Sequence, residues 1–164
     1  MAKERILVIN PGSTSTKIAL FQGEDLLFAE TLHHSSQELG TCRRVIDQLP
    51  LRWRSLENFL QEKRIDLGSL AAVVGRGGVL APVEGGTYIV NREMVTELRE
   101  APRGDHASNL GALLANEIAT KVGIPAYIVD PVVVDELEPI ARVSGMAGIN
   151  RRSIFHALNQ KAVA

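Results

Sequence analysis

The segment from Asn10 to Lys17 carries residue types that could handle a phosphate group. It reads Asn-Pro-Gly-Ser-Thr-Ser-Thr-Lys, so one tight turn offers a glycine backbone, four hydroxyl groups and a lysine. A phosphate needs several converging hydrogen-bond donors and a neutralising cation, and this turn supplies both. It is not a Walker A loop, because no glycine precedes the lysine and a strand rather than a helix is expected to follow. A solvent-exposed Ser/Thr-rich hairpin is the alternative interpretation.

Two further polar residues directly follow apolar runs that read as strands. Arg76 stands between Gly75 and the pair Gly77-Gly78, and Asp130 precedes Pro131. Flanking glycines let a backbone approach a ligand while the guanidinium binds an anion, and a carboxylate can hold Mg²⁺ through water. Ligands of open α/β sheets bind outside the carboxyl ends of the strands. The alternatives are a surface arginine and a turn-initiating aspartate.

Two histidines are further candidates. His106 precedes the best-formed helix of the sequence, where backbone amides attract anions and an imidazole can donate a proton. The alternative is capping of that helix by Asp105 or Ser108 beside a bystander histidine. His156 follows Phe155 and could stabilise a developing negative charge, although a lone helical histidine is more often structural. The motifs HExxH, CxxC and GxSxG are missing, so metalloprotease, thioredoxin and serine-hydrolase functions have no support.

Hydrophobic periodicity predicts the elements that must position these residues. Three short strands joined by tight turns should form an antiparallel meander, and helix-linked strands follow, which together indicate a mixed α/β sheet. The expected strands are residues 5–10, 16–21, 26–31, 70–74 and 126–129, with a short hairpin-like stretch at 87–90.

The helices are expected from apolar spacing and terminal signals. Ser35 and Glu38 have capping-box spacing at the start of a helical run that continues to residue 60, and Pro50 should kink this run or begin a second helix. Other helices are expected from residue 91, over 110–122, and from residue 150 onward. That last segment ends without a helix stop signal, which favours a chain that has been cut short.

Composition excludes several classes of protein. The chain has 164 residues, a net charge of −1 and 45% hydrophobic residues, as expected for a globular domain that binds neither nucleic acid nor membrane surfaces through bulk charge. Cys42 is the only cysteine, so no intramolecular disulfide or cysteine-based zinc cluster is possible. Neither a signal peptide nor a membrane span is evident, and a cytoplasmic location is expected.

Five blocks of the sequence resemble butyrate kinase, a relative of acetate and propionate kinases within the carboxylate kinase family. They occur in order over essentially the whole chain, and the first is the N-terminal signature. The blocks are residues 8–17, 73–78, 105–109, 127–135 and 153–160.

The resemblance implies an actin-like ATPase fold, shared with sugar kinases and related to ribonuclease H, with a five-stranded mixed sheet, a three-stranded meander and flanking helices. Residues 1–164 would be the first domain of a two-domain enzyme, inactive alone because the second domain is missing. The implied reaction is reversible, Mg²⁺-dependent phosphoryl transfer between ATP and butyrate, giving butyryl phosphate and ADP. Isobutyrate-type substrates, a non-catalytic phosphate- or nucleotide-binding module and a partner-forming module remain alternatives. The full-length enzyme is expected to be a homo-oligomer.

The resemblance also implies roles for individual residues. The catalytic group would be Arg76, His106, Asp130 and His156. The residues that hold the transferred phosphate and its nucleotide would be Asn10, Gly12, Ser13, Ser15 and Lys17, and the metal would bind at Asn10 and Asp130. The acyl pocket would include Gly77, Gly78, Pro131 and Phe155.

Two positions depart from acetate kinases. Acetate kinases have a bulky valine shortly after the arginine, where this chain has Gly77-Gly78, and we hypothesise that the missing side chains widen the acyl pocket. Pro11 replaces a cysteine or similar residue of acetate kinases, which also points toward the butyrate branch.

Overall fold

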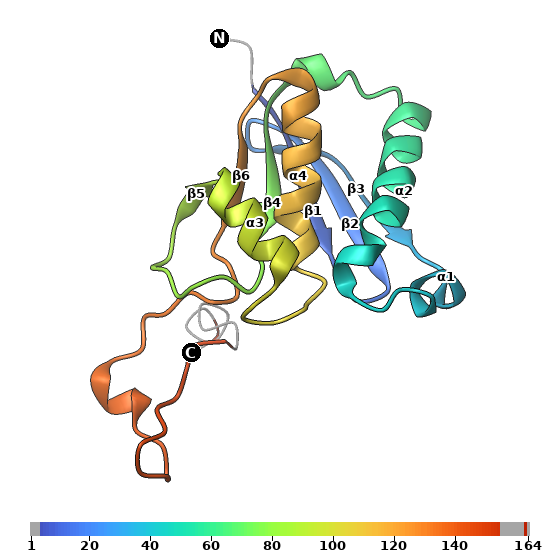
Figure 1. The fold of residues 1–164 in the computed structure, drawn as a ribbon. Helices are drawn as coiled ribbons and strands as arrows, with labels where there is room; N and C mark the ends of the chain where they lie inside the picture. The colour runs from blue at the N-terminus through green and yellow to red at the C-terminus, as the bar shows by residue number, and fades with distance from the viewer. Residues whose placement is uncertain (1–3, 155–162, 164) are drawn as a thin grey trace.

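A six-stranded mixed sheet forms the centre of the fold (Figure 1). The computed structural model describes residues 4–154 and 163. The strand order is β3-β2-β1-β4-β6-β5, in which β1, β4 and β6 are parallel to one another and the outer strands run antiparallel to their neighbours. The strands are β1 (Arg5–Pro11), β2 (Ser15–Gln22), β3 (Asp25–His33), β4 (Leu70–Arg76), β5 (Thr87–Ile89) and β6 (Ala126–Val129).

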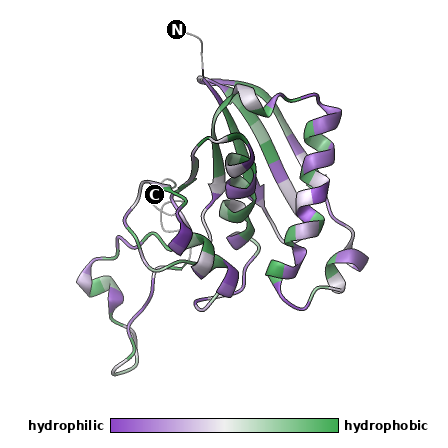
Figure 2. Ribbon diagram, turned by 45° about the horizontal axis from the view of Figure 1, so that its top comes forward, coloured by the Kyte–Doolittle hydropathy of each residue, from purple (hydrophilic) through white to green (hydrophobic). Residues whose placement is uncertain are grey.

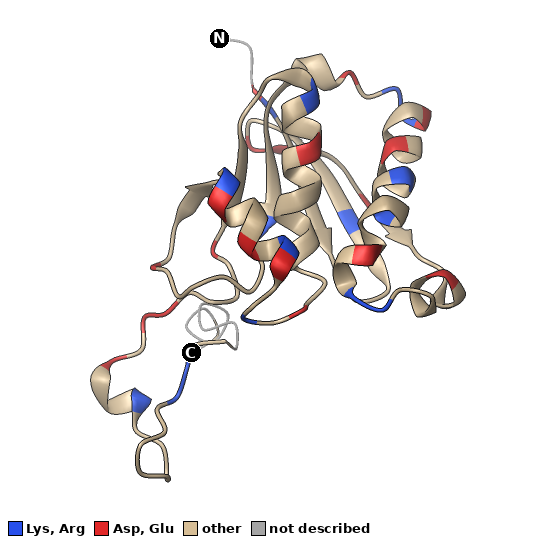
Figure 3. Cartoon of the chain, in the orientation of Figure 1, with Lys and Arg blue, Asp and Glu red and all other residues tan. Residues whose placement is uncertain are grey.

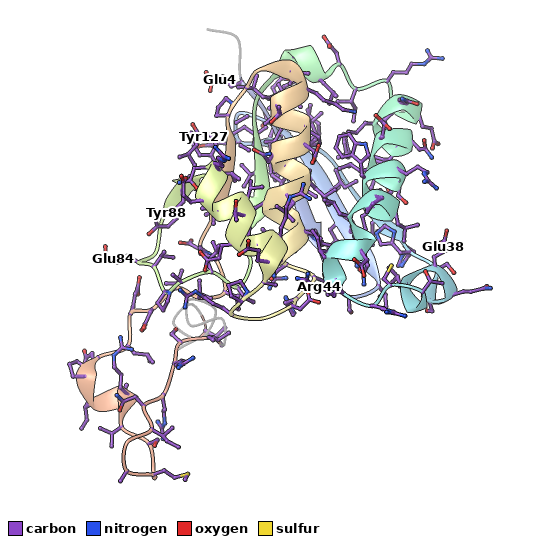
Figure 4. The ribbon with its side chains drawn as sticks, in the orientation of Figure 1. Glu4, Glu38, Arg44, Glu84, Tyr88 and Tyr127 are labelled. Carbon is purple, nitrogen blue, oxygen red and sulfur yellow. The ribbon has the colours of Figure 1, made fainter. Side chains whose placement is uncertain are left out.

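This topology confirms the predicted mixed sheet and its three-stranded meander, with one strand more than the five expected. The additional strand is β5, which the sequence indicated only as a hairpin-like stretch. It forms the edge of the sheet beside β6. The Tyr88 hydroxyl donates to the Glu84 carbonyl at 2.7 Å and braces the chain just before this strand; both residues are labelled in Figure 4.

Three helices pack on one face of the sheet: α2 (Leu49–Glu62), α3 (Arg92–Glu100) and α4 (Asn109–Val122). Figure 1 shows α4 crossing in front of β4 and β1. Apolar strand residues that alternate along the chain form the core together with apolar residues of α4. Figure 2 shows hydrophobic colours along these strands and along α4. The fully buried residues at this interface include Leu7, Ile9, Ile18, Val73, Leu110, Leu113, Leu114 and Ile118.

The helical run expected over residues 35–60 is divided into three pieces: α1 (Ser36–Gly40), the 3₁₀ turn η1 (Val45–Gln48) and α2. Ser35 caps α1 as predicted, but Gly40, a weak helix former, ends it. The Arg44 amide then donates to the Asp47 carboxylate at 2.9 Å and starts a new turn. Pro50 lies in the first turn of α2, where its missing N–H costs nothing, so the expectation of a second helix there is confirmed.

The backbones of β4 and α4 touch without side chains between them. A Cβ atom on Gly75 would overlap the carbonyl of Gly111, and a Cβ atom on Gly111 would overlap the carbonyl of Arg76. Glycine at both positions is therefore what allows the first turns of α4 to lie against the end of β4. This contact brings the loop before α4 close to the strand that carries Arg76.

Residues 136–154 form an arm that extends away from the sheet, at the lower left of Figure 1. The arm contains the 3₁₀ turn η3 (Pro139–Arg142) and a single bridge between Val143 and Asn150. Residues 150–154 are not helical, so the helix expected to begin at Asn150 does not begin there; residues 155–162 and 164 lie outside the described residues. The arm exposes the apolar side chains of Ile140, Val143, Met146, Ile149 and Ile154.

Among the described residues, no helix combines the length and the apolar character needed to cross a bilayer.

Candidate functional site

Asn10, Lys17 and Arg76 share the face of the sheet opposite the helices, near the carboxyl ends of β1 and β4. Asn10 is paired with Lys17 across the antiparallel ladder, so their side chains lie on the same face. Gly75 is paired with Ile9 on the helix-covered face, which places the next residue, Arg76, on the face of Asn10. The Arg76 Nη1 donates to the Asn10 Oδ1 at 3.3 Å. The sheet thus brings Arg76 to the same face as two residues of the Asn10–Lys17 segment, which the sequence singled out separately from it.

The turn between β1 and β2 is compact and held by its own backbone. The Gly12 amide donates to the Ser15 carbonyl at 2.7 Å, and the His34 amide donates to the Thr14 carbonyl at 2.9 Å. Ser13 and Thr14 are exposed at the tip. The predicted hairpin is therefore present, with its hydroxyl-bearing tip open to solvent.

A buried arginine that sequence reasoning missed lies directly beneath this turn. Arg52 of α2 is fully buried, and its Nη2 donates to the carbonyls of Gly12 at 2.8 Å and Ser13 at 3.0 Å. Its Nη1 donates to the Ser15 carbonyl at 3.0 Å, and its Nε to the Gln48 Oε1 at 3.1 Å. Burial lowers the pKa of the Arg52 guanidinium from its ordinary value.

Thr16 and His34 extend this polar cluster into the core. The Thr16 Oγ1 accepts from the Arg52 Nη1 at 3.1 Å and lies 2.8 Å from the His34 Nε2. Because the guanidinium can only donate, the hydroxyl proton is available to a neutral His34. Burial, with the Arg52 charge as the next cause, lowers the pKa of His34 and so favours that neutral form.

His106 lies in the exposed loop before α4. Its Nδ1 is 2.7 Å from the Ser108 Oγ. The capping alternative for its neighbours is wrong: the Ser108 side chain makes no cap hydrogen bond to α4, and the Asp105 Oδ2 instead accepts from the Val45 amide at 2.9 Å. Asn109 fixes the loop, since its Oδ1 accepts from the Val79 amide at 2.8 Å and its Nδ2 donates to the Gly104 carbonyl.

Asp130 follows the last residue of β6 and is one position beyond the Arg76–Val129 pair of the sheet. Its backbone has a left-handed conformation, with φ of 43°, which aspartate tolerates better than most residues. Its Oδ1 accepts from the Gly86 amide at 2.7 Å and so ties β6 to the start of β5. The second carboxylate oxygen and the remaining lone pairs still allow it to hold a cation through water.

Gly77 and Gly78 are tightly packed. A Cβ atom on Gly77 would overlap Pro131, and a Cβ atom on Gly78 would lie 2.5 Å from the Asn109 Oδ1 and 2.7 Å from the Leu98 side chain. The hypothesis that the missing side chains widen an acyl pocket is therefore wrong, because neighbouring residues already fill that space. The structure does place Gly77 against Pro131, two of the residues expected near the substrate.

The predicted residues of the terminal segment and the predicted metal site remain. His156 and Phe155 lie outside the described residues. In the described part of the chain, no cluster of three or more His, Cys, Asp or Glu side chains could hold a metal by itself. Mg²⁺ bound to nucleotide phosphates requires only one or two protein carboxylates with water, so Asp130 with Asn10 nearby fits that chemistry.

A hollow of about 630 Å³ lies between the arm and the loops after β4 and before α4. Among the described residues, none of those predicted for the site lines it. The Asp135 carboxylate in its wall binds Arg142 through both oxygens, at 2.9 Å each, and this pairing lowers the pKa of Asp135. Its other charged lining residues are Arg103, Arg151 and Arg152.

Charges of both signs lie along α2, α3 and α4 in the view of Figure 3. The cations of the candidate site, Lys17 and Arg76, are a local group at one end of the sheet. The net charge of −1 gives no sign of them, because charges of the other sign elsewhere balance them.

Solved structures with a similar fold include two kinases that act on short carboxylates. Over 96% of this chain, the acetate kinase of Porphyromonas gingivalis superposes with a TM-score of 0.60 at 15% sequence identity. The propionate kinase of Francisella tularensis superposes over 95% of the chain with a TM-score of 0.56 at 16% identity. The chain has the actin-like ATPase fold of these kinases.

The chain matches only part of each of these kinases. The chain spans 46% of the acetate kinase and 43% of the propionate kinase, less than half of either. An exopolyphosphatase from Cytophaga hutchinsonii also superposes, with a TM-score of 0.50 at 12% identity over 78% of this chain and 54% of its own. No known family's sequence profile matches the chain.

Proposed function

We propose that this chain is the first domain of a two-domain kinase that transfers a phosphoryl group reversibly between ATP and a short-chain carboxylate. The observation that carries the proposal is the Arg76–Asn10 contact beside Lys17, on one sheet face at the carboxyl ends of β1 and β4. The exposed β1–β2 turn adds hydroxyls and amides at the same end of the sheet. The shared fold with acetate and propionate kinases supports this assignment.

The chemistry asked of these residues is positioning and charge neutralisation, which dominate catalysis of phosphoryl transfer. Arg76 offers a fork of donors suited to a carboxylate or a phosphoryl group, and Lys17 adds a point charge. Asn10, Gly12, Ser13 and Ser15 would hold the phosphate from the turn. His106 would contact the phosphate from the loop before α4, and His156 would steady the negative charge of the transition state.

A magnesium ion bound with ATP would neutralise charge on the phosphates. Asp130 would hold it through water, with Asn10 on the neighbouring strand β1. In the structure these two side chains hydrogen-bond to Gly86 and Arg76, respectively, so binding the ion requires the Asn10 oxygen to be shared or released.

For the substrate we propose butyrate, with isobutyrate and related branched acids as the alternative. The support is the sequence resemblance, including Pro11, and not any space left by Gly77 and Gly78. Gly77 and Pro131, with Phe155, would still border the acyl chain through their backbone and ring atoms.

The binding part of the proposal is tested by calorimetric titration of the chain with acetyl phosphate and with Mg²⁺–ADP. The Arg76→Gln variant should weaken acetyl phosphate binding about tenfold, because a charged, forked donor is lost. Arg92→Gln, at an exposed position of α3, is the matched control and should change nothing. Equal affinities in the wild type and the Arg76 variant would exclude Arg76 from the anion site.

The catalytic part is tested by trapping acyl phosphate as its hydroxamate. The 164-residue chain should form none from ATP and any of acetate, propionate, butyrate or isobutyrate. A longer product of the same gene that contains a second domain should form it, fastest with butyrate. Activity of the chain alone would contradict the two-domain proposal, whereas phosphate binding without activity in the longer product would favour the non-catalytic module.

A further inference from the structure

Arg52 has an unusual set of partners for a buried cation. Its side chain is fully buried, yet within the part of the chain that the structure describes its hydrogen-bond partners are neutral oxygens and none is a carboxylate. Burying a charge is costly unless its hydrogen bonds are well satisfied. Three of these acceptors are carbonyls of one turn, those of Gly12, Ser13 and Ser15, so the guanidinium gathers the carbonyls of the β1–β2 turn on the buried side.

The orientation of those carbonyls fixes the orientation of the amides. In a trans peptide the C=O and N–H point in opposite directions, and the described residues contain no cis peptide. The Gly12 and Ser13 carbonyls point at Arg52, so the amides of Ser13 and Thr14 point away from it. Both residues are exposed, and no acceptor in the described part of the chain binds either amide. Two neighbouring amides therefore face outward at the tip of the turn.

Arg52 also acts on these donors through its charge. A carbonyl bound by a cation polarises its own peptide, which makes the N–H on the other side a stronger donor. A guanidinium keeps its charge wherever proteins remain folded, so this polarisation is permanent. An anion at the tip would meet two aligned amides backed by a buried positive charge.

The guanidinium is itself held in one orientation. Gln48 is four residues earlier, and its Oε1 accepts from both Nε at 3.1 Å and Nη2 at 2.9 Å. On the other side the Nη1 donates to the Thr16 Oγ1, which lies against the buried His34. The side chain of Arg52 is therefore fixed from both ends before any ligand arrives.

We infer that Arg52 is the positioning residue of the phosphate-binding turn: it holds the Gly12, Ser13 and Ser15 carbonyls inward so that the Ser13 and Thr14 amides face an incoming phosphate. This inference rests on the proposed function, since it assumes that the turn binds phosphate. Arg52 does not touch the ligand; it acts through the peptides between them.

The test uses the ¹⁵N-labelled chain titrated with inorganic phosphate, with the Ser13 and Thr14 amide signals as the readout. In the wild type both signals should shift with phosphate. Arg52→Lys keeps the charge but offers donors from a single atom, which cannot reach three carbonyls at once, so affinity should fall about tenfold. Arg54→Lys, two residues along on the exposed side of α2, is the matched control and should bind as the wild type does.

A second readout separates positioning from general stability. Hydrogen exchange at the Gly12 amide, which is bonded to the Ser15 carbonyl, should accelerate more in Arg52→Lys than exchange in α4 does, because the loss is local to the turn. If Arg52→Lys fails to fold, Gln48→Met removes only the bonds that orient the guanidinium and should weaken phosphate binding by about threefold.

The outcomes distinguish the inference from the function on which it rests. Wild-type binding with unchanged affinity in both Arg52→Lys and Gln48→Met overturns the positioning role and leaves the proposed function standing. Unchanged Gly12 exchange in Arg52→Lys also overturns it. If phosphate does not shift the wild-type amides at all, the proposed function falls and the positioning role falls with it.

Discussion

Two arginines each organise an irregular segment, and they do so in opposite ways. Arg52 is buried beneath the β1–β2 turn and binds neutral carbonyls, whereas Arg142 stabilises the arm from an accessible position and binds the Asp135 carboxylate. Arg52 is fully buried and supplies donors to the turn carbonyls from the core side, where water cannot replace it. Arg142 has a side chain that is 37% exposed, so water can partly replace it at the Asp135 carboxylate.

This difference determines how much each region depends on its arginine. Leaving buried acceptors unpaired costs their full desolvation, while an exposed ion pair contributes little. We therefore expect the turn to be rigid and intolerant of substitution and the arm to tolerate change. The following predictions run from the largest expected effect to the smallest, and each could break that contrast.

Substituting Arg52 by Met should have the largest effect. It removes every donor to the Gly12, Ser13 and Ser15 carbonyls and should lower the free energy of unfolding by about 3–5 kcal/mol. Denaturant unfolding followed by circular dichroism measures this. Arg54→Met on the exposed side of α2 should stay within about 0.5 kcal/mol of the wild type. If Arg52→Met loses no more free energy of unfolding than Arg54→Met does, the turn does not depend on its buried arginine and the contrast with the arm fails.

Adding one methyl group to a glycine should destabilise the packed sheet and helices but not the arm. Gly111→Ala places a Cβ against the Arg76 carbonyl and should cost about 1–3 kcal/mol, because the strand and helix backbones cannot separate freely. Gly145→Ala in the arm adds the same group where no atom lies within 4 Å, and we expect no loss. Unfolding curves of the two variants check the difference; equal losses would show that the arm is as tightly packed as the body.

Mild acid should weaken the turn before it weakens the arm. Burial lowers the pKa of His34 below its model-compound value of 6.5, so below that pH the unfolded chain takes up a proton that the folded chain resists. Stability from His34 is therefore present above that value and is lost as the pH falls; Arg52, Glu38 and His33 are its charged or titratable neighbours. Asp135 has a pKa below 3.8, so its contribution is unchanged over this range.

Thermal melts of the wild type and His34→Gln at about pH 7.5 and about pH 5.5 test this, since the difference between the two proteins isolates His34 from the other histidines. The wild-type midpoint should fall more than that of the variant. Parallel decreases would mean that other groups produce the acid sensitivity.

Substituting Asp135 by Asn should have the smallest effect on global stability. The ion pair with Arg142 is partly accessible to solvent and belongs to the arm rather than the core, so the thermal midpoint should change little. The local effect should be visible instead, as faster trypsin cleavage after Arg142 or Arg151. A clear decrease in the midpoint would place the arm within the cooperative unit of the fold and end the contrast.

Much of the fold could be predicted from sequence because it depends on local patterns. Alternating apolar residues and turn signals identified the meander, and the Gly123 and Pro125 signals marked the end of α4 correctly. Pro50 indicated the second helix of residues 35–60, but the end of α1 at Gly40 and the η1 turn were missed because periodicity continues across breaks in the backbone. Register then showed what no local pattern can show, that Asn10, Lys17 and Arg76 lie on one face.

Arg52 shows where sequence reasoning about the site ends. It lies three residues after Leu49 and four before Leu56, both buried, so it is on the core side of α2, and that position was the available signal. An arginine on an apolar stripe ordinarily extends its charge to solvent, and only the tertiary structure shows carbonyls from residues nearly forty positions earlier converging on it. The packing of Gly78 was likewise invisible, because the atoms that fill its space come from Asn109 and Leu98.

The glycine contact between β4 and α4 has a mechanical consequence. Where side chains separate two elements, rotamer changes can absorb a displacement, but between Gly75 and Gly111 the main chains themselves are in contact. A shift of the first turn of α4 toward the sheet therefore has to move the backbone of β4 at Arg76, because no side chain lies between them to give way. The spacing between the loop that carries His106 and the strand end that carries Arg76 is thus set by main-chain contact.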